Sequence, residues 1–368
     1  MRGFWAVLHK EALQMLRDRG ALQFALAVPV FQLVLFGLID TNVKHVPTAV
    51  FDQSRTQESR QLITDLVDTS YFEVVRYVGS RAALREVIVA GEASVGVEVP
   101  PDFARKRLYG RPADFLVLID GSDSTISAQA LAAANGLALD HSLEDLARRT
   151  GLRALPYQAN PLLLFNPDSR TANLLIPGLV AVLLTFSGTI LSAFAIVRER
   201  ERGTLEQLMV TPASPLSVML GKILPYLVLG FVQLLFILAL MRFVFMVPIH
   251  GSLGLLLGLS LIYLFSLLAL GLLISSRAAT QMEAIQMAQA FLLPSIMLSG
   301  YIFPLSSLPG PLRLVSVILP ATHFIAISRG IVIRGAAFMD MWQHVAALLV
   351  IAVVLVAASA RAFRKTIS

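Results

Sequence analysis

Six long apolar segments dominate this sequence and restrict the chain to folds that cross a membrane. They cover residues 21–39, 173–197, 218–241, 253–275, 285–303 and 343–362. A helix rises about 1.5 Å per residue, so roughly twenty residues cross the ~30 Å hydrocarbon core of a bilayer. The segments therefore predict an all-α membrane bundle of six transmembrane helices.

The composition agrees with this fold and excludes several functions. Only 15% of the 368 residues are charged, against about 25% in soluble domains. No cysteine is present and the six histidines are scattered, which excludes disulfides and thiol chemistry and gives no metal site. Residues 41–172 hold 14 basic and 16 acidic residues, whereas the rest holds 16 basic and 8 acidic. The positive excess flanks the apolar segments, so it indicates membrane topology and not a nucleic-acid partner.

The distribution of Lys and Arg predicts the orientation. Twelve flank the segments on the side of the two termini, and four lie in the short segments on the other side. Because cytoplasmic segments carry the basic excess, we expect both termini and the loop at 198–217 in the cytoplasm.

Four parts of the chain are expected. Residues 1–20 form an interfacial amphipathic helix with Phe4, Trp5 and Leu8 on its apolar side. Residues 21–40 form span 1. Residues 41–172 form an α/β extracytoplasmic domain, with strands at 46–52, 72–78, 93–99 and 114–120 and with Ser54 and Asp123 capping the helices that follow Asp52 and Asp120. Residues 173–368 form spans 2–6.

Prolines interrupt the segment before the last span. Its apolar stretches are too short to cross a bilayer, so the sequence predicts a re-entrant hairpin over 304–322 on the outer side, packed against other spans. The prolines that define it are Pro304, Pro309, Pro311 and Pro320.

The residues support neither ATP hydrolysis by this chain nor transport driven by an ion gradient. Gly221-Lys222 lacks the other residues of a phosphate-binding loop, so the chain should not hydrolyse ATP and should contain no catalytic residues. The spans carry few ionisable residues in mid-membrane, which disfavours an ion-coupled carrier.

The loop after the second apolar segment, RERERGTLEQLMVTP at 198–212, has an unusual charge pattern. Three acids stand among the bases, and a short helix with an apolar side follows. Two interpretations stay open from the residues alone, namely a solvated loop that sets topology and a helix that docks into a groove on a soluble partner.

This loop resembles the hallmark of type-2 ABC exporter permeases, the transmembrane subunits of ATP-binding-cassette exporters. FNPDSRTANLLIPGL at 165–179, LSGYIFPLSSLP at 298–309 and PATHFIAISRGIVIRG at 320–335 also fit the multidrug-efflux-like branch with large ectodomains. The resemblance implies an ATPase-coupling helix formed by Glu199, Arg200, Glu201, Gly203, Thr204, Leu205, Glu206 and Leu208.

The resemblance further implies the function and partners. It implies a multi-pass permease of the bacterial inner membrane that exports an amphipathic, drug-like or lipid-like substrate. It implies a second permease copy, as a homodimer or a paralogous heterodimer, and a cytoplasmic ATPase that holds ATP and Mg. Membrane lipid is the other expected partner. A periplasmic adaptor and an outer-membrane duct accompany some members. The alternatives are a non-transporting six-span receptor or scaffold and an ion-coupled secondary carrier.

Overall fold

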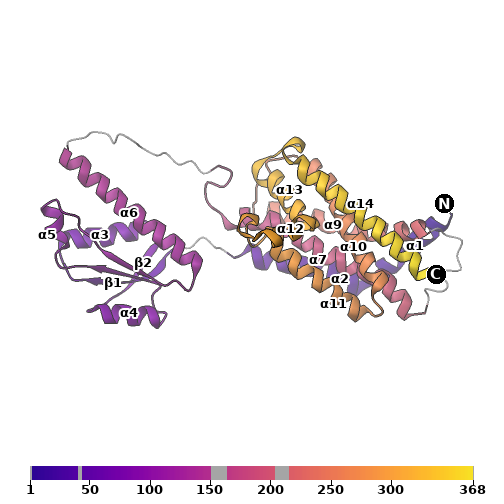
Figure 1. Cartoon of the computed structure of the whole chain (residues 1–368), viewed down its shortest axis with the longest axis horizontal. Helices are drawn as coiled ribbons and strands as arrows, with labels where there is room; N and C mark the ends of the chain where they lie inside the picture. The colour runs from indigo at the N-terminus through magenta and orange to yellow at the C-terminus, as the bar shows by residue number, and fades with distance from the viewer. Residues whose placement is uncertain (1, 40–43, 151–163, 204–214, 368) are drawn as a thin grey trace. The chain divides into compact units, whose positions relative to one another are not determined.

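The computed structural model describes residues 2–39, 44–150, 164–203 and 215–367. The chain divides into two compact units, one formed by residues 1–40 with 163–368 and the other by residues 41–162 (Figure 1). The first unit contains the apolar helices and the second contains the β-sheet. We call them the membrane unit and the sheet unit and describe each by itself.

The membrane unit is a bundle of helices. Among its described residues, four helices or helix segments are long and apolar enough to cross a bilayer, and a fifth crossing is counted if the bent pair α12 and α13 is one span. Its elements are α1 (Arg2–Arg17), α2 (Arg19–Gly37), α7 (Thr171–Glu201), α9 (Pro215–Phe243), α10 (Leu253–Arg277), α11 (Gln281–Leu298), η1 (Leu305–Ser307), α12 (Gly310–Ile318), α13 (Pro320–Arg334), η2 (Phe338–Met341) and α14 (Trp342–Ile367).

Two predicted spans are shorter or more polar than the others. The helix α2 has 19 residues, and the apolar helix found among its described side chains covers Ala25–Gly37. The helix α11 has 18 residues and begins with Gln281 and Glu283. The structure thus supports a mostly helical membrane protein with four or five clear spans, and the count of six stays a prediction.

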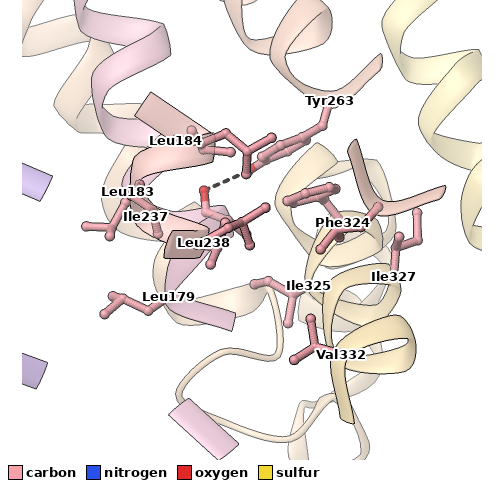
Figure 2. Packing of buried hydrophobic residues seen from close by; sticks show 14 of the residues in the cluster. Leu179, Leu183, Leu184, Ile237, Leu238, Tyr263, Phe324, Ile325, Ile327 and Val332 are labelled. Atoms are coloured by element: carbon pink, nitrogen blue, oxygen red, sulfur yellow. Dashed lines mark hydrogen bonds between the residues drawn. The ribbon is translucent and has the colours of Figure 1, made fainter. Parts of the chain in front are cut away.

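The helix α7 lies in the core of the membrane unit, and 83% of its most apolar 18-residue stretch is buried. Tyr263 of α10 stacks on Phe324 of α13 with ring centroids 4.2 Å apart (Figure 2). The Tyr263 hydroxyl donates to the Ala181 carbonyl of α7 over 3.0 Å and bonds to Thr185. Satisfying a buried hydroxyl in this way avoids a desolvation cost, so the apolar core tolerates a tyrosine.

A glycine allows α10 to approach α7 closely. A Cβ built at Gly271 would lie 1.8 Å from the Ser192 Oγ atom and 2.6 Å from the Thr189 carbonyl oxygen. Small residues at crossings let membrane helices pack at short distance. Gly271 therefore fixes the spacing of these two helices.

The sheet unit has four strands in the order β2-β1-β3-β4. The strand β1 pairs in parallel with β2 and β3, whereas β4 runs antiparallel to β3. One face packs on α3, α5 and α6 and the other on α4. The strands lie in the four segments where the sequence predicts them. The elements are β1 (Val46–Asp52), α3 (Gln57–Asp68), β2 (Phe72–Tyr77), α4 (Arg81–Val89), β3 (Val95–Val99), α5 (Phe103–Leu108), β4 (Leu116–Ile119) and α6 (Ser124–Thr150).

One of the two predicted helix caps is confirmed. The Asp123 carboxylate accepts hydrogen bonds from the backbone N–H groups of Thr125, at 2.8 Å, and of the next residue, at 3.1 Å. The prediction for Ser54 is wrong, because Thr56 is the N-cap of α3. Arg55 has a positive φ of 52°, so the chain turns there and the helix begins only after Thr56.

Candidate functional site

The segment before the predicted coupling loop is the end of α7, and the amphipathic helix α1 packs beside it. Val7 of α1 is buried in a core cluster that α7 and α9 share. Of the predicted interfacial residues, Phe4 and Leu8 are half-buried, whereas Trp5 is 65% exposed. The helix α1 thus has one side on the bundle and an exposed apolar ring on the other.

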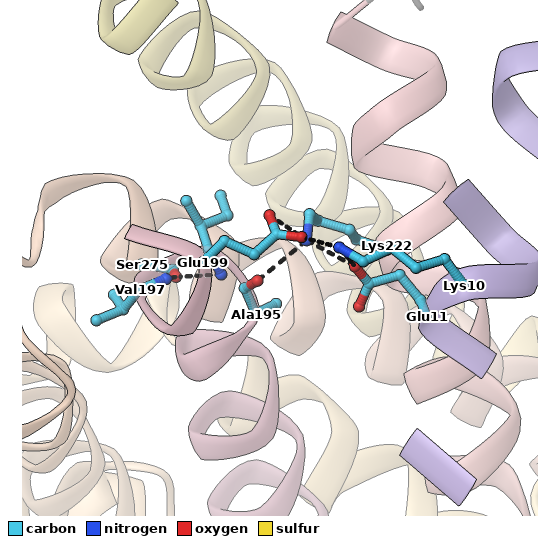
Figure 3. Close-up of polar contacts among 8 residues, drawn as sticks. Lys10, Glu11, Ala195, Val197, Glu199, Lys222 and Ser275 are labelled. Atoms are coloured by element: carbon cyan, nitrogen blue, oxygen red, sulfur yellow. Dashed lines mark hydrogen bonds and ion pairs between the residues drawn. The ribbon is translucent and has the colours of Figure 1, made fainter. Parts of the chain in front are cut away.

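Four charged side chains meet where α1, α7 and α9 come together, and we call them the charge cluster (Figure 3). Lys222 of α9 places its Nζ atom 2.8 Å from Glu11 Oε1 and 2.8 Å from Glu199 Oε2. It also donates to the Ala195 carbonyl over 3.1 Å. Lys10 bonds to Glu199 Oε1 and lies 3.6 Å from Glu11. The charge cluster therefore ties three segments together.

The charge cluster is neutral as a whole and mostly buried. The side chains of Lys222, Glu11 and Glu199 are 1%, 4% and 5% exposed, and that of Lys10 is 45% exposed. Burial by itself lowers the pKa of the Lys10 ammonium, but the hydrogen bond to Glu199 and the charges of Glu199 and Glu11 outweigh it and raise that pKa. Since an unpaired buried charge is costly, each member depends on the others.

Helix α10 also bonds to the last turns of α7, near the charge cluster. The Ser275 hydroxyl oxygen accepts hydrogen bonds from the backbone N–H groups of Ile196 and Val197, at 3.0 and 3.1 Å. Arg198 donates to Asp18, between α1 and α2, over 2.6 Å. The end of α7 is consequently fixed to several neighbours just before the loop.

Three of the residues predicted to couple to the ATPase lie in the last turn of α7, and they differ in burial. Glu199 is buried and paired inside the chain. Arg200 donates to the carbonyls of Ser276 and Ala278, at the end of α10. Glu201 is exposed and accepts from the Gln281 backbone over 2.7 Å.

The coupling loop begins as α7 ends. Gly203 is exposed and has a positive φ of 68°, with open space around a built Cβ. The remaining predicted residues, Thr204, Leu205, Glu206 and Leu208, lie outside the described residues.

The four prolines of the predicted hairpin mark helix starts. Pro304 and Pro309 are the N-caps of η1 and α12, Pro311 lies in the first turn of α12, and Pro320 begins α13. Proline suits these positions because the first N–H groups of a helix have no intrahelical partner. The helices α12 and α13 meet at 80°, a geometry that fits a broken span or a re-entrant loop.

The charge cluster was not predicted from the sequence, although a signal was present. Glu11 falls on the apolar side of α1, at helical spacing from Leu8 and Met15. Lys222 stands in the first turns of an otherwise apolar helix. An acid within an apolar stripe and a base within an apolar helix together indicate a buried pair.

Comparison with known proteins gives consistent matches over the whole chain. The family model described as "ABC-2 family transporter protein" matches residues 20–361. The probable multidrug ABC transporter permease YbhR of Escherichia coli K12 is 30% identical over 368 residues, covering 99% of this chain and 98% of the relative. The probable permease YbhS of the same strain is 30% identical, covering 90% and 88%. ABC transporter G family member 20 of Dictyostelium discoideum is 26% identical over 92% of this chain and 47% of its own length.

Proposed function

This chain belongs to the ABC-2 family of transporter proteins, and from that premise we propose that it exports an amphipathic, drug-like or lipid-like substrate from the cytoplasm or inner leaflet. As an ABC permease it is a transport protein and not an enzyme, and a separate subunit hydrolyses ATP. The apolar helices support an amphipathic substrate, since the buried Lys222 and Glu199 are already bonded to each other.

The observation that carries the mechanism is the charge cluster at the end of α7. Glu199 acts as a positioning residue, because its two oxygens bond to Lys10 of α1 and Lys222 of α9. The following loop docks on the ATPase through Thr204, Leu205, Glu206 and Leu208. A displacement of the loop is transmitted to α7, because close-packed interiors transmit strain.

Two contacts extend this transmission to the next helices. Arg200 bonds to carbonyls at the end of α10, and Glu201 bonds to Gln281 at the start of α11. The last turn of α7 thus connects the loop with the junction of α10 and α11. ATP and its Mg are held by the partner ATPase in this proposal, and this chain binds neither.

The proposed topology has six spans, namely α2, α7, α9, α10, α11 and α14, with α12 and α13 as a re-entrant hairpin on the outer side. Both termini and the loop at 198–217 face the cytoplasm of a bacterial inner membrane, and α1 lies at its surface. The basic excess on that side supports this orientation.

Cysteine labelling tests the topology, because the chain has no cysteine of its own. Ser122→Cys places a thiol at an exposed position of the sheet unit, and Ser214→Cys places one in the coupling loop. An impermeant thiol reagent on intact cells should label the first and spare the second. The reverse pattern would contradict the proposed orientation.

The proposed assembly contains two permease copies and two ATPases. A second copy follows from the resemblance to exporter permeases, and a periplasmic adaptor with an outer-membrane duct is proposed for the sheet unit. Gentle purification from native membranes, followed by identification of the co-purified proteins, tests this assembly.

Three substitutions in the loop test coupling. Truncating a buried leucine removes roughly 1.5–3 kcal/mol of transfer free energy, and losing one partner of a buried charge pair costs ~2–5 kcal/mol of association. Leu205→Ala, Glu206→Ala and Gly203→Pro should therefore lower export and weaken co-purification with the ATPase while leaving membrane insertion intact.

Leu108→Ala is the matched control, because Leu108 is 81% exposed in the sheet unit. It should leave co-purification with the ATPase unchanged, because the sheet unit is proposed to lie on the other side of the membrane. Wild-type export and ATPase binding in all three loop variants would show that the loop is merely solvated.

A further inference from the structure

An apolar groove lies on the surface of the membrane unit between α9, α10 and α14. Its volume is about 590 Å³, and its ten lining residues are all apolar. The helix α14 forms one wall. Only 22% of its most apolar 18-residue stretch is buried within the described part of the chain. Val353, which lines the groove, is 67% exposed. The groove is therefore open toward whatever surrounds the bundle.

Six of the ten residues that line the groove belong to α14. Small side chains line it along α14, at Ala352, Ala357 and Ala360, and Phe265 is among the residues that α10 contributes. The lining residues of α14 run from Leu349 to Ala360. At about 1.5 Å per residue this is roughly 17 Å, close to half of the ~30 Å hydrocarbon core. The groove thus has the length of an extended hydrocarbon chain in one leaflet.

One end of the groove is positively charged. Arg361 directly follows the lining residue Ala360 and is exposed. Val7 of the amphipathic helix α1 shares a core cluster with Ala360, so this end lies at the level of α1. Basic residues at a membrane surface attract anionic lipid headgroups.

We propose that the groove binds one acyl chain of an anionic phospholipid whose phosphate lies at Arg361. The apolar lining matches the chain, the length matches one leaflet, and the cationic end matches the headgroup. This site is separate from the coupling loop, so the proposal goes beyond the transport function and does not depend on it.

Native mass spectrometry of the detergent-purified chain with added dioleoylphosphatidylglycerol or dioleoylphosphatidylcholine tests the site. Wild type should retain the anionic lipid about fivefold more than the zwitterionic one, the ratio for one basic residue at the surface. Arg361→Gln should lower this preference, and Ala357→Phe should lower retention of both lipids severalfold by filling the groove.

Two controls separate the site from general lipid adhesion. Ala346→Phe adds the same ring at an exposed position of α14 outside the groove, and Arg313→Gln removes an exposed charge elsewhere. Both should behave like wild type. Equal retention by wild type and Ala357→Phe would overturn the proposal, as would an unchanged preference in Arg361→Gln, an exposed position whose substitution leaves folding intact.

A second copy of the chain is the competing occupant. Val353→Cys in this cysteine-free chain should form no disulfide-linked dimer on mild oxidation in native membranes, even where two copies assemble through another surface. Efficient disulfide dimers through Val353→Cys would show that another copy covers the groove and would refute the lipid site.

Discussion

Lys222→Met tests whether the charge cluster stabilises the membrane unit. The substitution keeps an unbranched side chain but removes an ammonium that bonds to Glu11, Glu199 and the Ala195 carbonyl. The two carboxylates are then left buried, with only the half-exposed Lys10 beside them.

The expected loss is large because the remaining charges cannot reach water. Removing one partner of a buried ion pair costs about 3–5 kcal/mol. For a unit of this size each kcal/mol lowers the melting temperature by about 2–4 °C. Lys10 offsets part of the loss, so we expect a fall on the order of 10 °C.

The assay is gel filtration in detergent after heating, which measures the fraction of folded protein against temperature. Arg313→Met is the matched control, because Arg313 is exposed, and surface charges contribute about 0–1 kcal/mol. Adding Glu11→Gln and Glu199→Gln to Lys222→Met should restore part of the lost stability, since no uncompensated buried charge then remains. If Lys222→Met melts within the range of Arg313→Met, the charge cluster does not stabilise the unit.

Three further predictions concern helix packing and chemistry. Gly271→Ala should destabilise the membrane unit by several °C in the same assay, because its Cβ would overlap Ser192, whereas Gly258→Ala meets open space and should not. Ser275→Ala should cost about 0.5–1.5 kcal/mol by removing the hydroxyl that bonds α10 to two N–H groups of α7, and Ser276→Ala, whose hydroxyl bonds within its own helix, should cost less. The purified chain should show no ATPase activity above a mock preparation in a phosphate-release assay.

Hydropathy and periodicity predict the elements of this fold well because they depend on neighbouring residues. The apolar run at 253–275 matches α10, and the strand predicted at 46–52 matches β1. The spans α2 and α11 stay predictions, and α11 has polar residues in its first turns.

The charge cluster is a different kind of feature, because its members are distant in sequence. Lys222 is 211 residues from Glu11, and Lys10 is 189 residues from Glu199. Periodicity predicts Lys10 and Glu11 only as parts of an amphipathic helix. Lys222 enters the sequence analysis only as one of the basic residues counted to predict the topology. Their pairing depends on how α1 packs against α7 and α9, which local patterns do not contain. The role of the coupling loop stays a prediction.

The charge cluster also has a consequence for how the protein is made. Synthesis proceeds from the N-terminus, so Glu11 leaves the ribosome 211 residues before Lys222, and Glu199 leaves it about 23 residues before. Inserting a lysine into lipid costs up to ~2.5–3.5 kcal/mol at the bilayer centre. Because both carboxylates precede it, α9 enters a membrane that already holds its counter-charges. A circular permutant that moved α1 to the C-terminus would present Lys222 to the bilayer before Glu11 exists.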